Sequence, residues 1–169
     1  MNIRQKMKLL AFDLARRTGF AIGETDCERP VSGFQTLGGN REEALEAFPS
    51  FFLRLVKEHE PKSVVFEAVP LNLNMMKTAA TAELLYGLSG QVRGLSAYLK
   101  LNPWSIGVFE VRKHFVGQAR PKDKKDAIVR RCNEVGWAVK DHNEADALAL
   151  WSCAAAKRFN RVGETGLGS

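Results

Sequence analysis

The hydrophobic residues near the start of the chain form short runs that predict three strands. Residues 8–13 (KLLAFD) are apolar except at their two ends, a pattern typical of a strand that is buried on both faces. A basic turn (ARRTG) follows, and residues 20–23 and 31–37 predict two further strands on either side of a polar loop. Because the connections are short, we expect these strands to form an antiparallel meander.

Helical and extended patterns alternate along the rest of the chain. Asn40 precedes an acid-rich segment (REEALEAF) that predicts the start of a helix, and Pro49 is expected to kink that helix or split it near Phe48. Residues 63–67 (SVVFE) and 103–110 (PWSIGVFE) predict the fourth and fifth strands. Further helices are expected over residues 78–99, before Phe115, over residues 124–135 and in the Ala- and Leu-rich segment that closes the domain. This order predicts a mixed sheet with helices on its faces, in the α/β class.

The composition is that of an ordinary globular domain, with 45% hydrophobic and 26% charged residues. No apolar tract approaches the ~20 residues needed to span a bilayer, and the first apolar stretch is too short for the core of a signal peptide. We therefore expect one cytoplasmic domain over residues 1–160 and a disordered tail over residues 161–169. The three widely spaced cysteines are expected to be buried free thiols: Cys27, Cys132 and Cys153.

Positive charge is concentrated in residues 100–131. This segment contains nine basic and three acidic residues, so it carries the whole net charge of +6. A basic surface on one third of a small domain is typical of a binding site for a polyanion. A solvated helix face rich in lysine is the alternative interpretation.

Three acidic residues lie where a catalytic site is expected. Asp13 and Glu67 each end a predicted strand, and such ends meet in the crevice where open α/β sheets bind ligands. Asp146 lies at the polar start of an apolar helix (NEADALAL). Carboxylates that share a partly buried site need a cation between them, and an all-oxygen ligand set favours Mg²⁺ or Mn²⁺ over zinc. Two such ions promote phosphodiester hydrolysis. Taken singly, each acid is also explained as a strand-end, surface-loop or first-turn residue.

The segments that carry these residues resemble the RuvC-like Holliday junction resolvases of the RNase H-like superfamily. The matching segments are LLAFDLARRTGFA, VVFEAV, VRKHFVGQARPKDKKDAIV and HNEADALALW, which follow the family's order and extend over residues 8–155. The resemblance implies an RNase H-like nuclease domain whose five-stranded sheet has three antiparallel strands followed by two parallel ones. The style of the last segment and the absence of further domains are more similar to the phage-type members.

The resemblance also implies an activity and partners. The expected activity is Mg²⁺-dependent cleavage of branched DNA, such as a four-way junction, with Mn²⁺ as a substitute and no organic cofactor. Resolution of a junction needs two symmetric nicks, so a homodimer is implied. The small residues of the helix over residues 78–99 suit a dimer face, or equally burial within one chain.

The resemblance assigns catalytic, metal-binding roles to Asp13, Glu67 and Asp146. The family usually has a fourth acid three positions before the last one, where this chain has Asn143. The amide oxygen of Asn143 can still take part in catalysis, and Asp141 is the expected replacement metal ligand. Glu144 is a weaker candidate, because it lies about 200° around the helix from Asp146.

Basic residues complete the expected site. Arg112 stands where the family often has a lysine, and Lys124 or Lys125 matches a second basic position; a cation there stabilises negative charge that develops on the phosphate. Plain phosphate contact or solvation is the alternative role. We expect Lys125 to contribute to catalysis, and we expect DNA to be bound by Arg112, Lys113, Arg120, Lys122, Lys124 and Lys125.

The loop after Glu67 often carries an aromatic wedge in the family, and this chain has Pro70 there. The apolar residues that remain as wedges, or as core or dimer contacts, are Leu71, Leu73, Met75 and Met76.

Two other functions are considered. An actin-like ATPase fragment is disfavoured because no glycine follows Asp13. A non-catalytic module that binds branched nucleic acid is kept open by Asn143.

Overall fold

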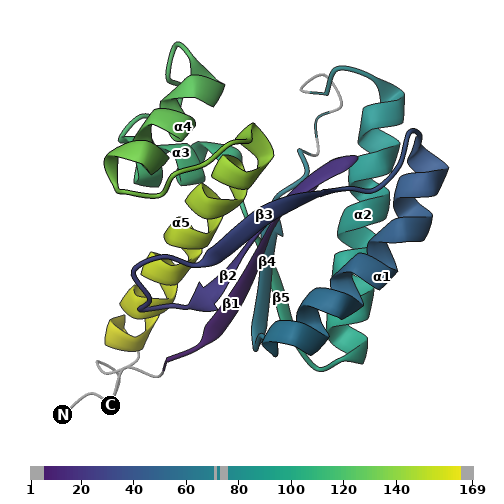
Figure 1. Ribbon diagram of the computed structural model, residues 1–169, viewed down its shortest axis with the longest axis horizontal. Coiled ribbons are helices and arrows are strands. Elements are labelled where there is room, and N and C mark those ends of the chain that lie inside the picture. Colours follow the sequence, from purple (N-terminus) through teal and green to yellow (C-terminus); the bar gives the residue numbers. More distant parts are fainter. Residues whose placement is uncertain (1–5, 71, 73–75, 165–169) are drawn as a thin grey trace.

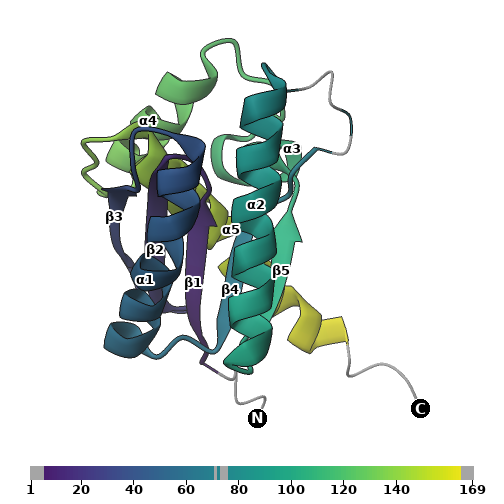
Figure 2. The ribbon, with the colours of Figure 1, turned by 90° about the vertical axis from the view of Figure 1, so that its right-hand side faces the viewer.

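The computed structural model describes residues 6–70, 72 and 76–164, except for the side chains of Lys125 and of residues 159–164. One five-stranded sheet lies between two layers of helices (Figure 1). Helices α1 and α2 cover one face, and α3, α4 and α5 lie on the other (Figures 1 and 2). None of the helices in the described part of the chain is long and apolar enough to cross a membrane.

The sheet has the mixed topology expected from the sequence. Its strands lie in the order β3-β2-β1-β4-β5; β2 is antiparallel to both of its neighbours, β1 and β3, whereas β1, β4 and β5 are parallel. The strands are β1 (Lys8–Asp13), β2 (Arg17–Glu24), β3 (Val31–Thr36), β4 (Ser63–Glu67) and β5 (Asn102–Ile106). The predicted fifth strand is too long, because Gly107 caps the next helix and residues 108–110 are helical.

The helices are α1 (Arg41–His59), α2 (Ala79–Tyr98), α3 (Val108–Val116), α4 (Lys124–Glu134) and α5 (His142–Glu164). Asn40 caps α1 as predicted, its side chain accepting a hydrogen bond from the backbone N–H of Glu43. Helix α5 extends into the segment expected to be a disordered tail, whose residues 165–169 lie outside the described residues.

The expectation that Pro49 splits the first helix near Phe48 is wrong, because α1 is continuous from Arg41 to His59, whereas the alternative, a kink at Pro49, stays a prediction. Proline has no N–H to donate to the carbonyl four residues earlier, which is that of Leu45. The side-chain amide of Gln91, on the neighbouring helix α2, donates a hydrogen bond to that carbonyl at 2.8 Å. A tertiary contact therefore replaces the helical hydrogen bond that Pro49 removes.

Two hydrophobic clusters fill the spaces on either side of the sheet. Alternation along β1 sends Leu10 and Phe12 into the cluster beneath α1 and α2, and sends Leu9 and Ala11 into the cluster beneath α5. Both faces are buried, which explains why the sequence of β1 is apolar without a polar alternation.

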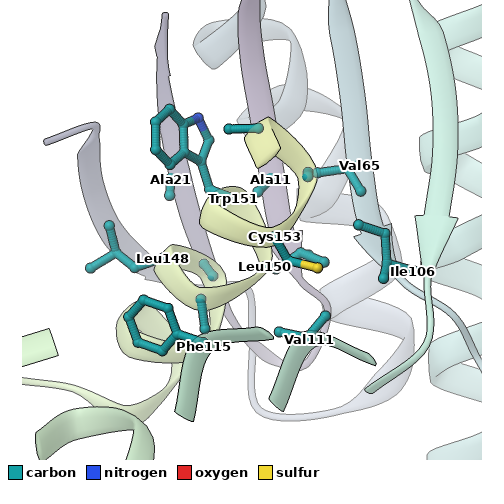
Figure 3. Packing of buried hydrophobic residues seen from close by; sticks show 14 of the residues in the cluster. Ala11, Ala21, Val65, Ile106, Val111, Phe115, Leu148, Leu150, Trp151 and Cys153 are labelled. Carbon is teal, nitrogen blue, oxygen red and sulfur yellow. The ribbon is translucent and has the colours of Figure 1, made fainter. Parts of the chain in front are cut away.

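Helix α5 packs directly on the centre of the sheet, as Figure 3 shows for the cluster that surrounds Leu148, Leu150 and Trp151. The small buried residues of α5 allow this close approach: Ala145, Ala147, Ala149, Ala154 and Ala155.

Cys132 and Cys153 are buried free thiols as predicted, whereas Cys27 is half-buried. Burial raises the pKa of the Cys132 thiol to about 12 and that of Cys153 to about 11, so both stay protonated at neutral pH.

Candidate active site

Two carboxylates lie side by side at the carboxyl ends of adjacent parallel strands. Phe12 of β1 is in register with Phe66 of β4, so the next residues along the two strands are Asp13 and Glu67. Neighbouring strands lie about 4.8 Å apart. Asp13 follows Ala11 on the same face of the sheet, and Glu67 follows Val65, and both of those apolar residues pack against α5. The alternation of the strands therefore turns both carboxylates toward the α5 side.

A glycine on β2 determines how closely the start of α5 approaches these strands. Gly19 pairs with Asp13 in the β1–β2 ladder. A Cβ atom at Gly19 would overlap the backbone carbonyl of Asn143, in the first turn of α5. The missing side chain lets the helix lie against the sheet at this point, and Asp146 follows one turn later. A glycine inside a strand is a sequence signal of such a close approach, which sequence analysis had not used.

Asp13, Glu67 and Asp146 line one cavity of about 90 Å³. The other lining residues come from the helices above it: Val108, Val111 and Arg112 of α3, and Ile128 of α4. The three acids that sequence analysis placed in one site are therefore brought together from β1, β4 and α5.

The environment of this cavity disfavours the charged form of Glu67. Burial raises the pKa of Glu67 to about 7; the negative charge of Asp146 adds to this rise, and the positive charge of Arg112 opposes it. A cation that enters such a site reduces the repulsion between the carboxylates and offsets the energetic cost of removing them from water. The cavity therefore favours a bound positive charge.

Arg112 supplies one positive charge from within the protein. It is half-buried on α3, and its Nε atom is buried without a hydrogen-bond partner. The same residue lines the cavity together with the three acids. Sequence analysis placed Arg112 beside the scissile phosphate, and the structure places it beside the carboxylates.

The donor set of the cavity fits a hard divalent cation, because the side chains that could bind a metal there are all carboxylates, with no sulfur or imidazole ligand. The side-chain positions themselves do not yet form a metal site. Within the described part of the chain, no group of three or more His, Cys, Asp or Glu side chains is arranged to hold an ion. Binding of a cation would require these carboxylates to move toward one another.

Asp141, the expected fourth ligand, caps α5 instead of lining the cavity. Its Oδ1 accepts hydrogen bonds from the backbone N–H of Asn143 at 2.8 Å and of Glu144 at 3.4 Å. Its Oδ2 lies 2.9 Å from the guanidinium of Arg17, which also stacks on the ring of Phe34. Sequence analysis did not identify Arg17, and no local pattern links it to a residue more than a hundred positions away.

Asn143 and Glu144 also lie apart from the cavity lining. Asn143 contributes backbone contacts to the cap of α5 and to Gly19. The carboxylate of Glu144 accepts a hydrogen bond from the hydroxyl of Ser32 on β3 at 2.7 Å. Glu144 therefore faces away from Asp146, as its position around the helix predicted.

The other predicted DNA-binding residues lie on α3, α4 and the loop between them. Lys113, Arg120, Lys122 and Lys124 are exposed, and the guanidinium of Arg120 lies 5.0 Å from the centre of the Phe109 ring. Lys125 is in α4, but its side chain is outside the described part. Beside them is a cavity of about 400 Å³ lined in part by Lys122, Arg130 and Arg131, of which Arg130 is paired with Asp123 at 2.6 Å.

Most of the expected wedge residues are not placed. Leu71, Leu73 and Met75 lie outside the described residues. Met76 lines a cavity of about 440 Å³ at the start of α2. Tyr86 lines the same cavity, and its hydroxyl donates a hydrogen bond to the carbonyl of Pro70 at 2.9 Å.

No protein-family model and no curated protein match the sequence. Solved structures do match the fold. Thermus thermophilus RuvC in complex with a Holliday junction substrate superposes with a TM-score of 0.73 and 14% identity, over 91% of this chain and 96% of that chain. Another T. thermophilus RuvC structure gives a TM-score of 0.66 and 15% identity, over 93% and 97% of the two chains. The yeast mitochondrial Holliday junction resolvase Ydc2 gives a TM-score of 0.64 and 10% identity, over 93% of this chain and 83% of that chain. The chain therefore has the RNase H-like fold of the RuvC-like resolvases, as its sequence segments predicted.

Proposed function

We propose that this protein is an endonuclease that cleaves branched DNA, including Holliday junctions, by metal-dependent phosphodiester hydrolysis. The observation that carries the proposal is the convergence of Asp13, Glu67 and Asp146 on one cavity, in a fold shared with a RuvC solved on a junction substrate. The basic surface of α3 and α4 lies next to this cavity and suits a polyanion.

The chemistry follows from the residues that line the cavity. Asp13, Glu67 and Asp146 would hold Mg²⁺, or Mn²⁺ in its place. Such ions, when bound in pairs, lower the pKa of water and stabilise a leaving oxygen. Arg112 neutralises negative charge beside the phosphate, and Lys125 is proposed to assist from α4. Apolar contacts from Val108, Val111 and Ile128 limit the access of water to the acids.

The remaining basic residues hold the DNA arms through phosphate contacts: Arg112, Lys113, Arg120, Lys122, Lys124 and Lys125. We also propose that the protein acts as a homodimer, because two symmetric nicks resolve a four-way junction. The exposed face of α2, with Gly90, Gly94 and Tyr98, offers room for a second copy, because nothing contacts the Cβ positions of the two glycines. A cytoplasmic location agrees with three cysteines that form no disulfide.

The test is cleavage of matched four-way, three-way and linear DNAs in Mg²⁺, with each strand labelled in turn. We expect paired nicks in the four-way junction. The Asp13→Asn variant should lose about 100-fold or more in rate, because a carboxylate ligand worth several kcal/mol is removed, and should still bind the junction. Equal cleavage of all three DNAs, or full activity of Asp13→Asn, would refute the proposal.

A non-catalytic module that binds branched DNA is the second candidate. It is favoured by Asn143, which replaces the fourth acid and does not line the cavity. Tight junction binding without nicking, in either Mg²⁺ or Mn²⁺, would identify this function.

A further inference from the structure

The cavity formed by Asp13, Glu67 and Asp146 is also lined by the positively charged side chain of Arg112. It measures only about 90 Å³, and its remaining lining residues, Val108, Val111 and Ile128, are apolar. A divalent cation that enters the cavity would therefore share the same three carboxylates with the guanidinium of Arg112.

Arginine cannot avoid this competition by losing its proton. Its guanidinium stays charged throughout the accessible pH range, whereas a lysine ammonium gives up its proton readily when it is desolvated. Repulsion between like charges in a partly buried cavity is strong because little water screens it. A divalent cation among the carboxylates therefore repels the guanidinium of Arg112 and weakens its attraction to them.

The contacts of Arg112 indicate that a movement away from the carboxylates is possible. No ion pair shorter than 4.0 Å joins Arg112 to an acid in the described part of the chain, and its buried Nε has no hydrogen-bond partner. Among the described residues, no ion pair and no hydrogen bond to Nε therefore anchors Arg112, and its positive charge opposes the negative charge of Asp146 at Glu67.

We infer that Arg112 is an internal counter-cation for the three carboxylates, which a divalent metal displaces and which then becomes free to contact the DNA phosphate. The contact between Arg112 and the DNA phosphate rests on the proposed function. The displacement of Arg112 by a metal is a property of the protein without DNA. Metal entry and phosphate binding are thereby coupled, because each removes Arg112 from the carboxylates or gives it another partner.

The test is Mn²⁺ binding to the protein alone, measured by isothermal titration calorimetry and by the loss of the free Mn²⁺ signal in electron paramagnetic resonance. Arg112→Met should bind Mn²⁺ about tenfold more tightly than the unmodified protein, because the competing charge is gone. Arg112→Gln, which keeps a polar end, should show the same direction and serves if the Met variant does not fold. Both should cleave junctions more slowly despite tighter metal binding.

Lys113→Met is the matched control. It removes the same charge from the next position of α3, but Lys113 is exposed and does not line the cavity. Its Mn²⁺ affinity should change by less than about twofold at physiological salt. Unchanged or weaker Mn²⁺ binding by folded Arg112→Met or Arg112→Gln would overturn the inference, even if the protein cleaves junctions. If the protein neither binds Mn²⁺ nor cleaves, and the variants do not bind it either, the proposed function fails as well.

Discussion

Glu67 lies at the buried end of β4, where its carboxyl group shares a cavity with Asp13 and Asp146. Its pKa rises from 4.5 to about 7 on folding, mainly through burial. Between these two values the unfolded chain loses a proton that the folded chain keeps. The contribution of Glu67 to the free energy of unfolding should therefore be highest below pH 4.5 and should fall, by up to about 3 kcal/mol, as the pH rises to about 7.

The Glu67→Gln variant should remove this dependence, because an amide does not titrate. Urea unfolding in EDTA at several pH values between 4 and 8 measures the difference between the two proteins, in which the other titrating groups cancel. We expect Glu67→Gln to become the more stable of the two as the pH approaches 8. A difference that stays constant with pH would show that the carboxyl of Glu67 has an ordinary pKa.

The sequence was informative about the acids at strand ends and less so about those near helix starts. Asp13 and Glu67 were expected to lie together because each follows an apolar run and parallel neighbours end at the same edge of a sheet, and both line one cavity. Asp141 and Asp146 both precede or begin α5, and sequence alone does not tell a capping carboxylate from one that faces a cavity. The ion pair with Arg17, which engages the other carboxylate oxygen of Asp141, joins residues distant in sequence.

At the scale of elements, the position of α5 on the sheet depends on Gly19. Gly19→Ala places a methyl group against the carbonyl of Asn143, which is backbone and cannot turn aside. We expect a loss of about 1–3 kcal/mol in unfolding free energy, measured in urea, as for other overpacked sites. Because the start of α5 must move, Asp146 should separate from Asp13, and junction cleavage should fall even where the variant remains folded.

Gly90→Ala is the control for this substitution. Gly90 is in α2, and within one chain a Cβ atom there meets no other atom within 4 Å, so the two substitutions are compared at protein concentrations at which the chain is monomeric. Alanine is favoured over glycine inside a helix, so the variant should gain up to about 1 kcal/mol. Equal effects of the two substitutions would show that Gly19 matters only for backbone entropy.

The contact between Gln91 and α1 makes a separate prediction. Gln91→Met removes the hydrogen bond to the carbonyl of Leu45, which Pro49 leaves without a helical donor, and should cost about 1–2 kcal/mol. In a Pro49→Ala background the restored N–H can satisfy Leu45, so the same substitution should cost less than half as much. Urea unfolding of the four proteins in this double-mutant cycle measures the coupling. Equal losses in both backgrounds would contradict this role for Gln91.

The same contact explains why Pro49 does not split the first helix. A proline in a helical pattern is a local signal of a break, and it was interpreted locally. The compensating donor comes from α2, 46 positions later in the chain. Helix and strand types followed from short-range periodicity, whereas element ends depended on capping residues such as Gly107 and on contacts between elements.

At the scale of the whole molecule, positive charge and the acidic cavity lie on the same side of the sheet. Helices α3 and α4 lie beside the beginning of α5 in Figure 1, and they carry most of the basic segment. Lys57, near the end of α1, and Lys62, directly before β4, by contrast precede the start of β4, at the opposite end of that strand from Glu67. This arrangement predicts that DNA affinity depends on where a charge lies and not only on the net charge of +6.

Substituting Lys122 and Lys124 together with glutamine should therefore weaken junction binding and its salt dependence. Both side chains are exposed, and neither forms an ion pair in the described part of the chain. Each lost phosphate contact lowers the slope of log affinity against log salt by about 0.9, so the double variant should lose nearly 2. Fluorescence anisotropy in EDTA, which prevents cleavage, measures these slopes.

Glutamine at Lys57 and Lys62 changes the net charge equally and should change the slope by less than about 0.5. Equal effects of the two pairs would mean that DNA responds to total charge, and that α3 and α4 do not form the binding surface.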